Sequence, residues 1–307
     1  MMSLPLVTVV ITTYERPENL MRAIDSVESQ TYPNIEIIVV DDNGKGADWQ
    51  VKTKELLKPL IDENRIKYIA HDVNRNGSAA RNTGLAYSSG EYINFLDDDD
   101  EFSVNKIEES VRVLEKDRSV DGVFCSTVFK NGASSVLFDN PPSDNPSADL
   151  LLGKLLFNTS TLCFRKNALK SIGGFDESFR RHQDYELVVR FCCKYKLANT
   201  VQCHITKHKS ENIVTRKPQI TVYFLEFFIT KFRDLFLAWP NGKEIIAHRY
   251  KIVARDMAAS GYYKESLYCL RMAGRYKNPS FKFILKCLAH IIRNMLRNNL
   301  HNSTSTK

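Results

Sequence analysis

Residues 90–100 read GEYINFLDDDD, a short apolar strand that ends abruptly in four aspartates. Two earlier stretches end in the same way: residues 6–13 read LVTVVITT before a Tyr-Glu-Arg-Pro turn, and residues 35–40 read IEIIVV before two aspartates. Helical patterns with apolar residues three and four positions apart separate these strands. Strands that alternate with helices over residues 6–128 predict a mostly parallel sheet with helices on both faces.

The strand ends carry polar side chains that could form one site. In open parallel sheets, ligands bind beyond the carboxyl ends of the strands. Four adjacent carboxylates repel one another, so we expect a cation or hydrogen-bond donors to compensate them. Alternate residues of an extended segment point the same way, so Asp97 and Asp99 could share one hard cation, with Asp98 and Asp100 turned elsewhere. The alternative is an acidic turn that caps the helix predicted after Ser103.

Composition restricts the class of protein. The chain has 307 residues, 43% of them hydrophobic, and a formal net charge of +7, which excludes disordered and collagen-like classes. No run approaches the roughly 18 uncharged residues of a membrane span, and the first residues lack the pattern of a secretory signal. The seven scattered cysteines form no CxxC pair, so we expect reduced thiols in a cytoplasmic protein.

Charge is distributed unevenly along the chain. From Arg216 onward there are 17 Lys and Arg against 5 Asp and Glu, whereas the preceding part has 26 against 31. The pattern after residue 216 is helical throughout, with two helices meeting near Gly261 and a last helix over 281–297. We therefore predict a main domain over residues 1–215 and a basic helical extension over 216–307. Residues 131–150 are rich in Asn, Gly, Ser, Asp and Pro, which predicts a long loop or flap.

Five short motifs occur in a fixed order: VVITTYERP at 9–17, VVDDN at 39–43, NGSAARN at 76–82, GEYINFLDDDD at 90–100, and GGFDE followed by HQDYEL within 173–187. In this order and spacing they resemble the family 2 glycosyltransferases, which have the GT-A fold. The resemblance covers about residues 6–212. It implies an α/β fold, a three-layer nucleotide-binding sandwich with a mostly parallel sheet, and it leaves the C-terminal helical extension outside.

The resemblance implies roles in nucleotide binding. Thr12 and Tyr14 match residues that line the base pocket, Asp42 matches the acid that reads the base edge, and Arg81 matches a basic residue beside the nucleotide. A structural alternative stays open for each position. These alternatives are strand-end packing for Thr12 and Tyr14, turn formation for Asp42, and a surface ion pair for Arg81.

The resemblance also implies a divalent metal, Mn or Mg. Asp97 and Asp99 match the DxD motif, which contacts the ribose and the diphosphate-bound metal. Because position 98 is also an aspartate, Asp98 could take over one of the nucleotide-sugar contacts. His208 resembles a downstream histidine that approaches the metal, so Asp99 and His208 are the predicted metal ligands. A solvent-facing loop histidine is the alternative for His208, and His204 competes for the same role.

Asp184 matches the general base of the family. Transfer to a sugar hydroxyl needs a carboxylate that removes the proton as the oxygen attacks the anomeric carbon. The usual Glu before this Asp is Gln183 here, which keeps the hydrogen-bonding shape but loses the charge. The alternative for Asp184 is a favourable charge at a helix N-terminus. The Q-x-x-R-W motif and transmembrane helices of processive members are missing, so we expect transfer of a single sugar.

We therefore expect an inverting, metal-dependent glycosyltransferase that uses a nucleotide-diphosphate sugar, UDP-linked, and acts in cell-surface polysaccharide biosynthesis. The acceptor would be a hydroxyl of a glycan or of a lipid-linked molecule. The alternative is a catalytically silent nucleotide-sugar-binding protein that acts on a partner through its helical tail. A sugar-phosphate nucleotidyltransferase would need a glycine-rich loop after the first strand, and residues 12–17 contain no glycine.

Several interpretations of the basic tail stay open. It could be a helical cap on the main domain, or an interfacial helix on an anionic leaflet, peripheral to the inner face of the cytoplasmic membrane. In the second case each basic residue near the surface would contribute roughly 1 kcal/mol. Nucleic acid is the least favoured partner, because the tail carries no recognised nucleic-acid motif. The tail could also bind a partner protein or a second copy, and the sequence does not determine the oligomeric state.

Overall fold

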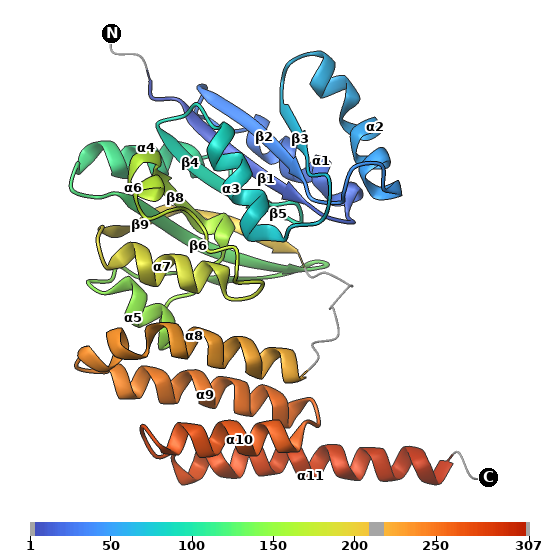
Figure 1. Ribbon diagram of the computed structural model, residues 1–307, viewed down its shortest axis with the longest axis vertical. Helices are drawn as coiled ribbons and strands as arrows, with labels where there is room; N and C mark the ends of the chain where they lie inside the picture. Colours follow the sequence, from blue (N-terminus) through green and yellow to red (C-terminus); the bar gives the residue numbers. More distant parts are fainter. Residues whose placement is uncertain (1–3, 209–217, 305–307) are drawn as a thin grey trace. The chain divides into compact units, whose positions relative to one another are not determined.

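The computed structural model describes residues 4–208 and 218–304 (Figure 1). The chain divides into two compact units, Met1–Glu211 and Asn212–Lys307. The boundary that we predicted between residues 215 and 216 lies outside the described residues.

The first unit is built on one mixed sheet with the strand order β3-β2-β1-β4-β8-β6-β9-β5, and β7 pairs with β6. Strands β3, β2, β1 and β4 run parallel, whereas β8 pairs antiparallel with both β4 and β6. The strands are β1 (Val7–Thr13), β2 (Ile35–Asp41), β3 (Lys67–Ala70), β4 (Tyr92–Asp97), β5 (Asp100–Phe102), β6 (Gly122–Asn131), β7 (Ser134–Phe138), β8 (Leu162–Arg165) and β9 (Leu197–His208). The predicted α/β class is confirmed; besides the N-terminal half of the sheet, β6 and β9 also pair in parallel.

Helices pack on both faces of this sheet. Val9 and Ile11 of β1 belong to a core with α1, α2 and α4, whereas Val10 belongs to a second core with α3, α5, α6 and α7. Neighbouring residues of a strand point to opposite faces, so two cores on one strand mean a three-layer arrangement. The helices are α1 (Pro17–Glu28), α2 (Asp48–Asp62), α3 (Gly77–Tyr87), α4 (Lys106–Lys116), α5 (Pro146–Leu151), α6 (Lys166–Ser171) and α7 (Gln183–Cys192).

Helix α3 lies against β1 because of two residues. A Cβ at Gly84 would be 2.2 Å from a methyl carbon of Val10, so only glycine allows this approach. At the other end, the Asn76 side chain accepts hydrogen bonds from the backbone N–H groups of Ser78 and Ala79. This N-cap places the first turn of α3 beside the carboxyl ends of the parallel strands.

The prediction of a long loop over 131–150 is wrong. The segment contains β7, which forms a hairpin with β6, and the short helix α5. Its polar residues do form turns and caps: Gly132 has a positive φ of 58°, and the Asn145 side chain accepts from the N–H of Ala148. The pairing itself comes from β6, whose exposed end offers an unpaired edge that the composition of 131–150 does not reveal.

Within the described residues, all the regular secondary structure of the second unit is helical. It contains α8 (Pro218–Ala238), α9 (Gly242–Ala259), α10 (Tyr263–Gly274) and α11 (Phe281–Thr304). Gly261 lies between α9 and α10, as predicted, and α11 continues beyond the predicted end at residue 297. Inside the unit, Glu226 accepts hydrogen bonds from the hydroxyl groups of Tyr250 and Tyr268. None of the described helices combines the length and apolarity needed to cross a membrane.

Candidate active site

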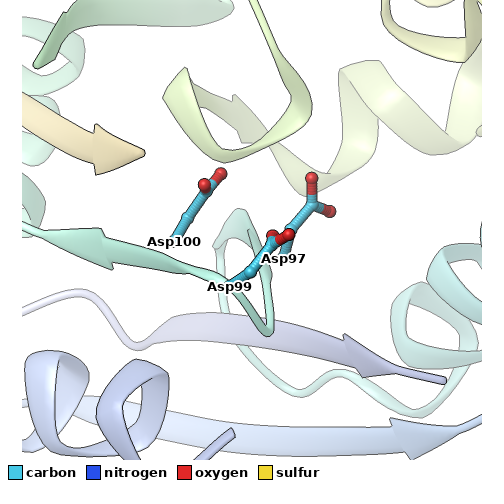
Figure 2. A group of neighbouring side chains, drawn as sticks. All are labelled: Asp97, Asp99 and Asp100. Carbon is cyan, nitrogen blue, oxygen red and sulfur yellow. The ribbon is translucent and has the colours of Figure 1, made fainter. Parts of the chain in front are cut away.

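The four aspartates form a turn between two strands. Asp97 ends β4, Asp98 and Asp99 make the turn, and Asp100 begins β5. One carboxylate oxygen from each of Asp97, Asp99 and Asp100 lies within 4.8 Å of the others (Figure 2). The expectation that Asp100 turns elsewhere is therefore wrong, because side chains alternate only along extended backbone and the turn ends that alternation. Asp98 does turn away, and its buried carboxylate accepts a 2.8 Å hydrogen bond from Thr13.

Three basic side chains compensate these carboxylates. Arg81 lies 2.5 Å from Asp97, Lys207 lies 2.9 Å from both oxygens of Asp100, and Arg16 contacts Asp98 and Asp99.

The surroundings shift the pKa values of two of these acids in opposite directions. Burial raises the pKa of Asp98 to about 7, and its contact with Arg16 only partly opposes this shift. For Asp97, burial is again the largest single influence and by itself would raise the pKa. The positive charges of Arg81 and Lys207 together outweigh burial, so the pKa of Asp97 is lowered.

The group of three carboxylates fits a hard divalent cation. Its ligand atoms are all carboxylate oxygens, which suit Mg²⁺ and Mn²⁺ rather than the softer metals that prefer sulfur or imidazole. Two of the three side chains are partly open to solvent, so a cation carried by a ligand could reach them. Asp97, Asp99 and Asp100 are the residues that would hold such a cation.

A pocket of about 340 Å³ adjoins the aspartates. It lies at the carboxyl ends of β1, β2 and β4 and at the N-terminus of α3, where parallel sheets bind ligands. Five of the residues predicted from the sequence line it together: Thr12, Tyr14, Asp42, Arg81 and Asp97. The other lining residues are Thr13, Arg16, Asn74, Asn76, Gly77 and Ala80. The Tyr14 side chain is 43% exposed, which leaves its ring available to a ligand.

Asp42 is the most extensively hydrogen-bonded of these residues. Its buried carboxylate accepts from the backbone N–H groups of Arg75 and Asn76 and from the side chain of Asn74, and it lies 2.7 Å from Nδ1 of His71. These contacts hold residues 71–76 against the end of β2. The carboxylate thus shapes the pocket wall through this loop, and its reading of a base edge stays a prediction.

Asp184 lies at the N-terminus of α7, which a chain of contacts ties to the pocket. Gln183 accepts a 2.6 Å hydrogen bond from one guanidinium nitrogen of Arg81, and another nitrogen of Arg81 contacts Asp97. Asp184 accepts from the backbone N–H of Tyr185, and burial raises the pKa of its carboxyl group. The role of Asp184 as a base stays a prediction.

The structure places His208 beside a different acid. Its Nε2 lies 2.5 Å from Glu101. Among the described residues, the side chains grouped closely enough to share a metal ion are the three aspartates, without His208. Its neighbour Lys207 is the residue of β9 that reaches Asp100. The metal-binding role of His208 stays a prediction.

Sequence reasoning missed three residues that contact the aspartates. Arg16 and Lys207 add to the positive charge of Arg81, and Ser160 donates to Asp100 while accepting from the backbone N–H of Asp97. Arg16 belongs to the quoted YERP turn, so its position was visible although its partner was not. No pattern in the sequence points to Ser160. The turn that contains it comes close to β4 only because β8, which follows the turn, pairs with β4 in the sheet.

The mixed sheet, the pocket at its parallel strand ends and the acidic turn are the features of the GT-A fold that the motifs implied. A family model described as Glycosyl transferase family 2 matches residues 8–173, more than half of the chain. The chain belongs to glycosyltransferase family 2.

Individual relatives are bacterial glycosyltransferases. The amylovoran biosynthesis glycosyltransferase AmsB of Erwinia amylovora is 30% identical over 191 residues, which cover 60% of this chain and 62% of AmsB. The putative colanic acid biosynthesis glycosyl transferase WcaA of Escherichia coli (strain K12) is 28% identical over 244 residues, which cover 76% of this chain and 83% of WcaA. The chain thus spans less than two thirds of the length of AmsB.

Solved structures share the fold at low sequence identity. TarS of S. aureus in complex with UDP-GlcNAc has a TM-score of 0.65 at 15% identity, covering 86% of this chain and 79% of that chain. The mannosyltransferase PcManGT of Pyrobaculum calidifontis, in complex with GDP-Man and Mn²⁺, has a TM-score of 0.61 at 17% identity, covering 99% and 84%. These likenesses confirm the GT-A fold that the motifs implied.

Proposed function

We propose that this enzyme transfers one sugar, with inversion, from a UDP-linked sugar to a hydroxyl of a glycan or lipid-linked acceptor in cell-surface polysaccharide biosynthesis. The observation that carries this proposal is the contact of Arg81 with both Asp97 and Gln183, because it joins the donor pocket to the helix that bears Asp184. The names of the relatives support the pathway: AmsB and WcaA are named for amylovoran and colanic acid biosynthesis. A further relative, WfaP of Escherichia coli, is named as a glucosyltransferase acting on a diphosphoundecaprenol-linked sugar.

The pocket offers separate contacts for the parts of the donor. The exposed ring of Tyr14 and the hydroxyl of Thr12 face the space where we place the base, beside the loop held by Asp42. Arg16 and Arg81 line the same pocket and are suited to anionic phosphate oxygens. When bound, Mn²⁺ or Mg²⁺ would supply positive charge that offsets the charge of the departing diphosphate.

Asp184 then serves the acceptor. Its carboxylate takes the proton of the attacking hydroxyl while that oxygen bonds to the anomeric carbon and the nucleoside diphosphate leaves. Because burial raises its pKa, the Asp184 carboxylate is a stronger base than an exposed aspartate. The Gln183 side chain is an uncharged amide and does not act as a base. Its hydrogen bond instead orients Arg81 toward Asp97.

The substitution Asp184→Asn tests this assignment. We expect transfer to fall at least 100-fold, the lower range for loss of a general base, while donor affinity stays within about twofold. UDP-glucose, UDP-GlcNAc and GDP-mannose would be screened with Mn²⁺ or Mg²⁺ and a membrane lipid extract, scoring the released nucleoside diphosphate. Asp176→Asn, which removes the charge of a partly buried turn acid that accepts from Ser178, is the matched control.

Two results would contradict the proposal. Transfer that survives in Asp184→Asn would remove the assigned base. A wild-type protein that binds donors tightly but turns over none of them would favour the catalytically silent binding protein.

The helix α11 supports contact with an anionic membrane surface. Phe281, Leu285, Leu288 and Ile292 recur at helical spacing and are between 41% and 75% exposed. The exposed basic residues Lys282, Lys286 and Arg293 lie beside this stripe, and α11 contains no Asp or Glu. We propose that the stripe inserts into an anionic leaflet, where a lipid-linked acceptor would be found. A second copy is disfavoured as its partner, since two basic faces would repel each other.

Vesicle flotation tests this contact. We expect the protein to float with phosphatidylglycerol-containing vesicles and much less with pure phosphatidylcholine, and Ile292→Glu to reduce flotation several-fold. Val136→Glu, at an exposed position of β7, is the matched control and should float like the wild type. Equal flotation of Ile292→Glu and wild type, or a stable dimer that Ile292→Glu dissolves, would contradict the membrane assignment.

A further inference from the structure

Arg16 occupies the corner between the first strand and the aspartate turn. It precedes α1 directly, as its N-cap residue, and Glu15 before it has a positive φ of 58°. The backbone N–H of Glu15 donates a 2.7 Å hydrogen bond to the side chain of Asn43 at the end of β2, which holds this unusual conformation in place. The corner thereby aims the Arg16 side chain at the aspartates.

The two ion pairs of Arg16 differ in their surroundings. On one side its Nη2 lies 2.7 Å from Asp98, a carboxylate with no exposed surface that Thr13 also holds. On the other side its Nη1 contacts Asp99, which is 22% exposed and belongs to the group with Asp97 and Asp100. Asp98 is thus a fixed anchor, whereas Asp99 is a carboxylate that a divalent cation would also need.

We propose that Arg16 and the divalent cation exchange on Asp99, and that the diphosphate of the donor drives the exchange. Without a donor, Arg16 neutralises Asp99 and its positive charge disfavours a cation there. Arg16 also lines the donor pocket, and a guanidinium binds phosphate oxygens in a forked geometry. The arriving diphosphate therefore draws one arm of Arg16 away and frees Asp99. Arg16 is a positioning residue that makes metal and donor bind together.

This inference rests on the proposed donor and metal, and binding measurements test it without turnover. Free Mn²⁺ would be followed by electron paramagnetic resonance with and without saturating UDP. The measured quantity is the Mn²⁺ dissociation constant without UDP divided by the Mn²⁺ dissociation constant with UDP, called the coupling ratio below. In Arg16→Met we expect Mn²⁺ to bind about tenfold more tightly without UDP, because one nearby positive charge is lost. The coupling ratio should therefore fall about tenfold. Separately, affinity for UDP without metal should fall about tenfold, and affinity for UMP should not change.

Arg22→Met is the matched control. Arg22 pairs with Glu101 at 2.9 Å and donates to the backbone oxygen of Asp99, so the variant loses the same charge but no contact with the Asp99 carboxylate. The coupling ratio of Arg22→Met should stay within twofold of the wild-type value. Arg16→Lys keeps the charge but loses the fork, so its ratio should lie between those of wild type and Arg16→Met, and this variant replaces Arg16→Met if the latter does not fold.

The outcomes separate the inference from the proposed function. If Mn²⁺ and UDP bind together in the wild type but the ratio is the same in Arg16→Met and Arg22→Met, the exchange is refuted and the proposed function stands. If Mn²⁺ binds to no variant, even with UDP or GDP present, both the exchange and the proposed metal are refuted. Weaker Mn²⁺ binding in Arg16→Met without nucleotide would also refute the exchange.

Discussion

The substitution Asp42→Asn should destabilise the first unit, because a carboxamide cannot replace the buried carboxylate. One carboxylate oxygen accepts the backbone N–H of Arg75, and the other accepts the backbone N–H of Asn76, each at 2.9 Å. Asparagine has one oxygen and one NH₂ group. Whichever way the amide points, one of the two backbone N–H groups faces another donor.

The magnitude follows from these contacts. A buried donor without a partner costs about 1–3 kcal/mol, and hydrogen bonds to a charged group are about twice as strong as neutral ones. We therefore expect Asp42→Asn to lower the free energy of unfolding by about 2–4 kcal/mol. For a domain of roughly 200 residues this corresponds to a fall in Tm of about 5–15 °C.

Thermal unfolding followed by circular dichroism measures this effect. Asp62→Asn is the control, since Asp62 forms an exposed pair with Lys58 one helical turn away, and its loss should change stability by less than about 0.5 kcal/mol. Donor binding should weaken in Asp42→Asn as well, because Asn74 and Asn76 line the pocket. A variant that melts within about 2 °C of the wild type, which corresponds to no more than about 1 kcal/mol, yet binds no UDP would assign Asp42 to base recognition alone and refute the structural reasoning.

Three further predictions concern pH and packing. The kcat/KM of transfer should rise with pH through a pKa above the ordinary aspartate value, because burial raises the pKa of Asp184; a profile that is flat across the acid range would argue against this base. Glu36→Gln should cost about 1–2 kcal/mol at pH 7 in denaturant titrations. Burial alone would raise the pKa of Glu36, but hydrogen bonds from a lysine, a threonine and a serine lower it to about 2, so this stabilisation is present above the unfolded pKa near 4.5 and should vanish as the pH falls toward 2. Gly84→Ala should cost about 1–3 kcal/mol, since its Cβ would clash with Val10, whereas Gly274→Ala, with no atom closer than 3.7 Å, should cost nothing; equal melting temperatures for the two would contradict the packing.

The parallel half of the sheet was predictable because its signals are local. Each strand is a run of β-branched and apolar residues that ends at polar ones, and each helix shows its own spacing. Parallel strands place their carboxyl ends at one edge, so Thr12, Asp42 and Asp97 could be expected together from the order of elements alone. The structure places all three in the lining of one pocket.

The half of the sheet formed by β5 to β9 was less predictable because its signals are nonlocal. Strand β7 pairs with the part of β6 that extends beyond β8, whose own pairing with β6 ends at Phe124. Likewise, the turn at Asp98 and Asp99 brings Asp100 toward Asp97, which an alternating extended segment would not do. Neither outcome depends on the residue types of the segment by themselves.

The sequence by itself determined the family, the alternation of strands and helices, and the edge of the sheet where the chemistry lies, because these follow from short-range periodicity and from motifs in a fixed order. Only the tertiary structure determined which positive charge meets which carboxylate. Arg16, Arg81 and Lys207 come from three distant parts of the chain, and ion pairing depends on distances across the fold that no spacing in the sequence encodes.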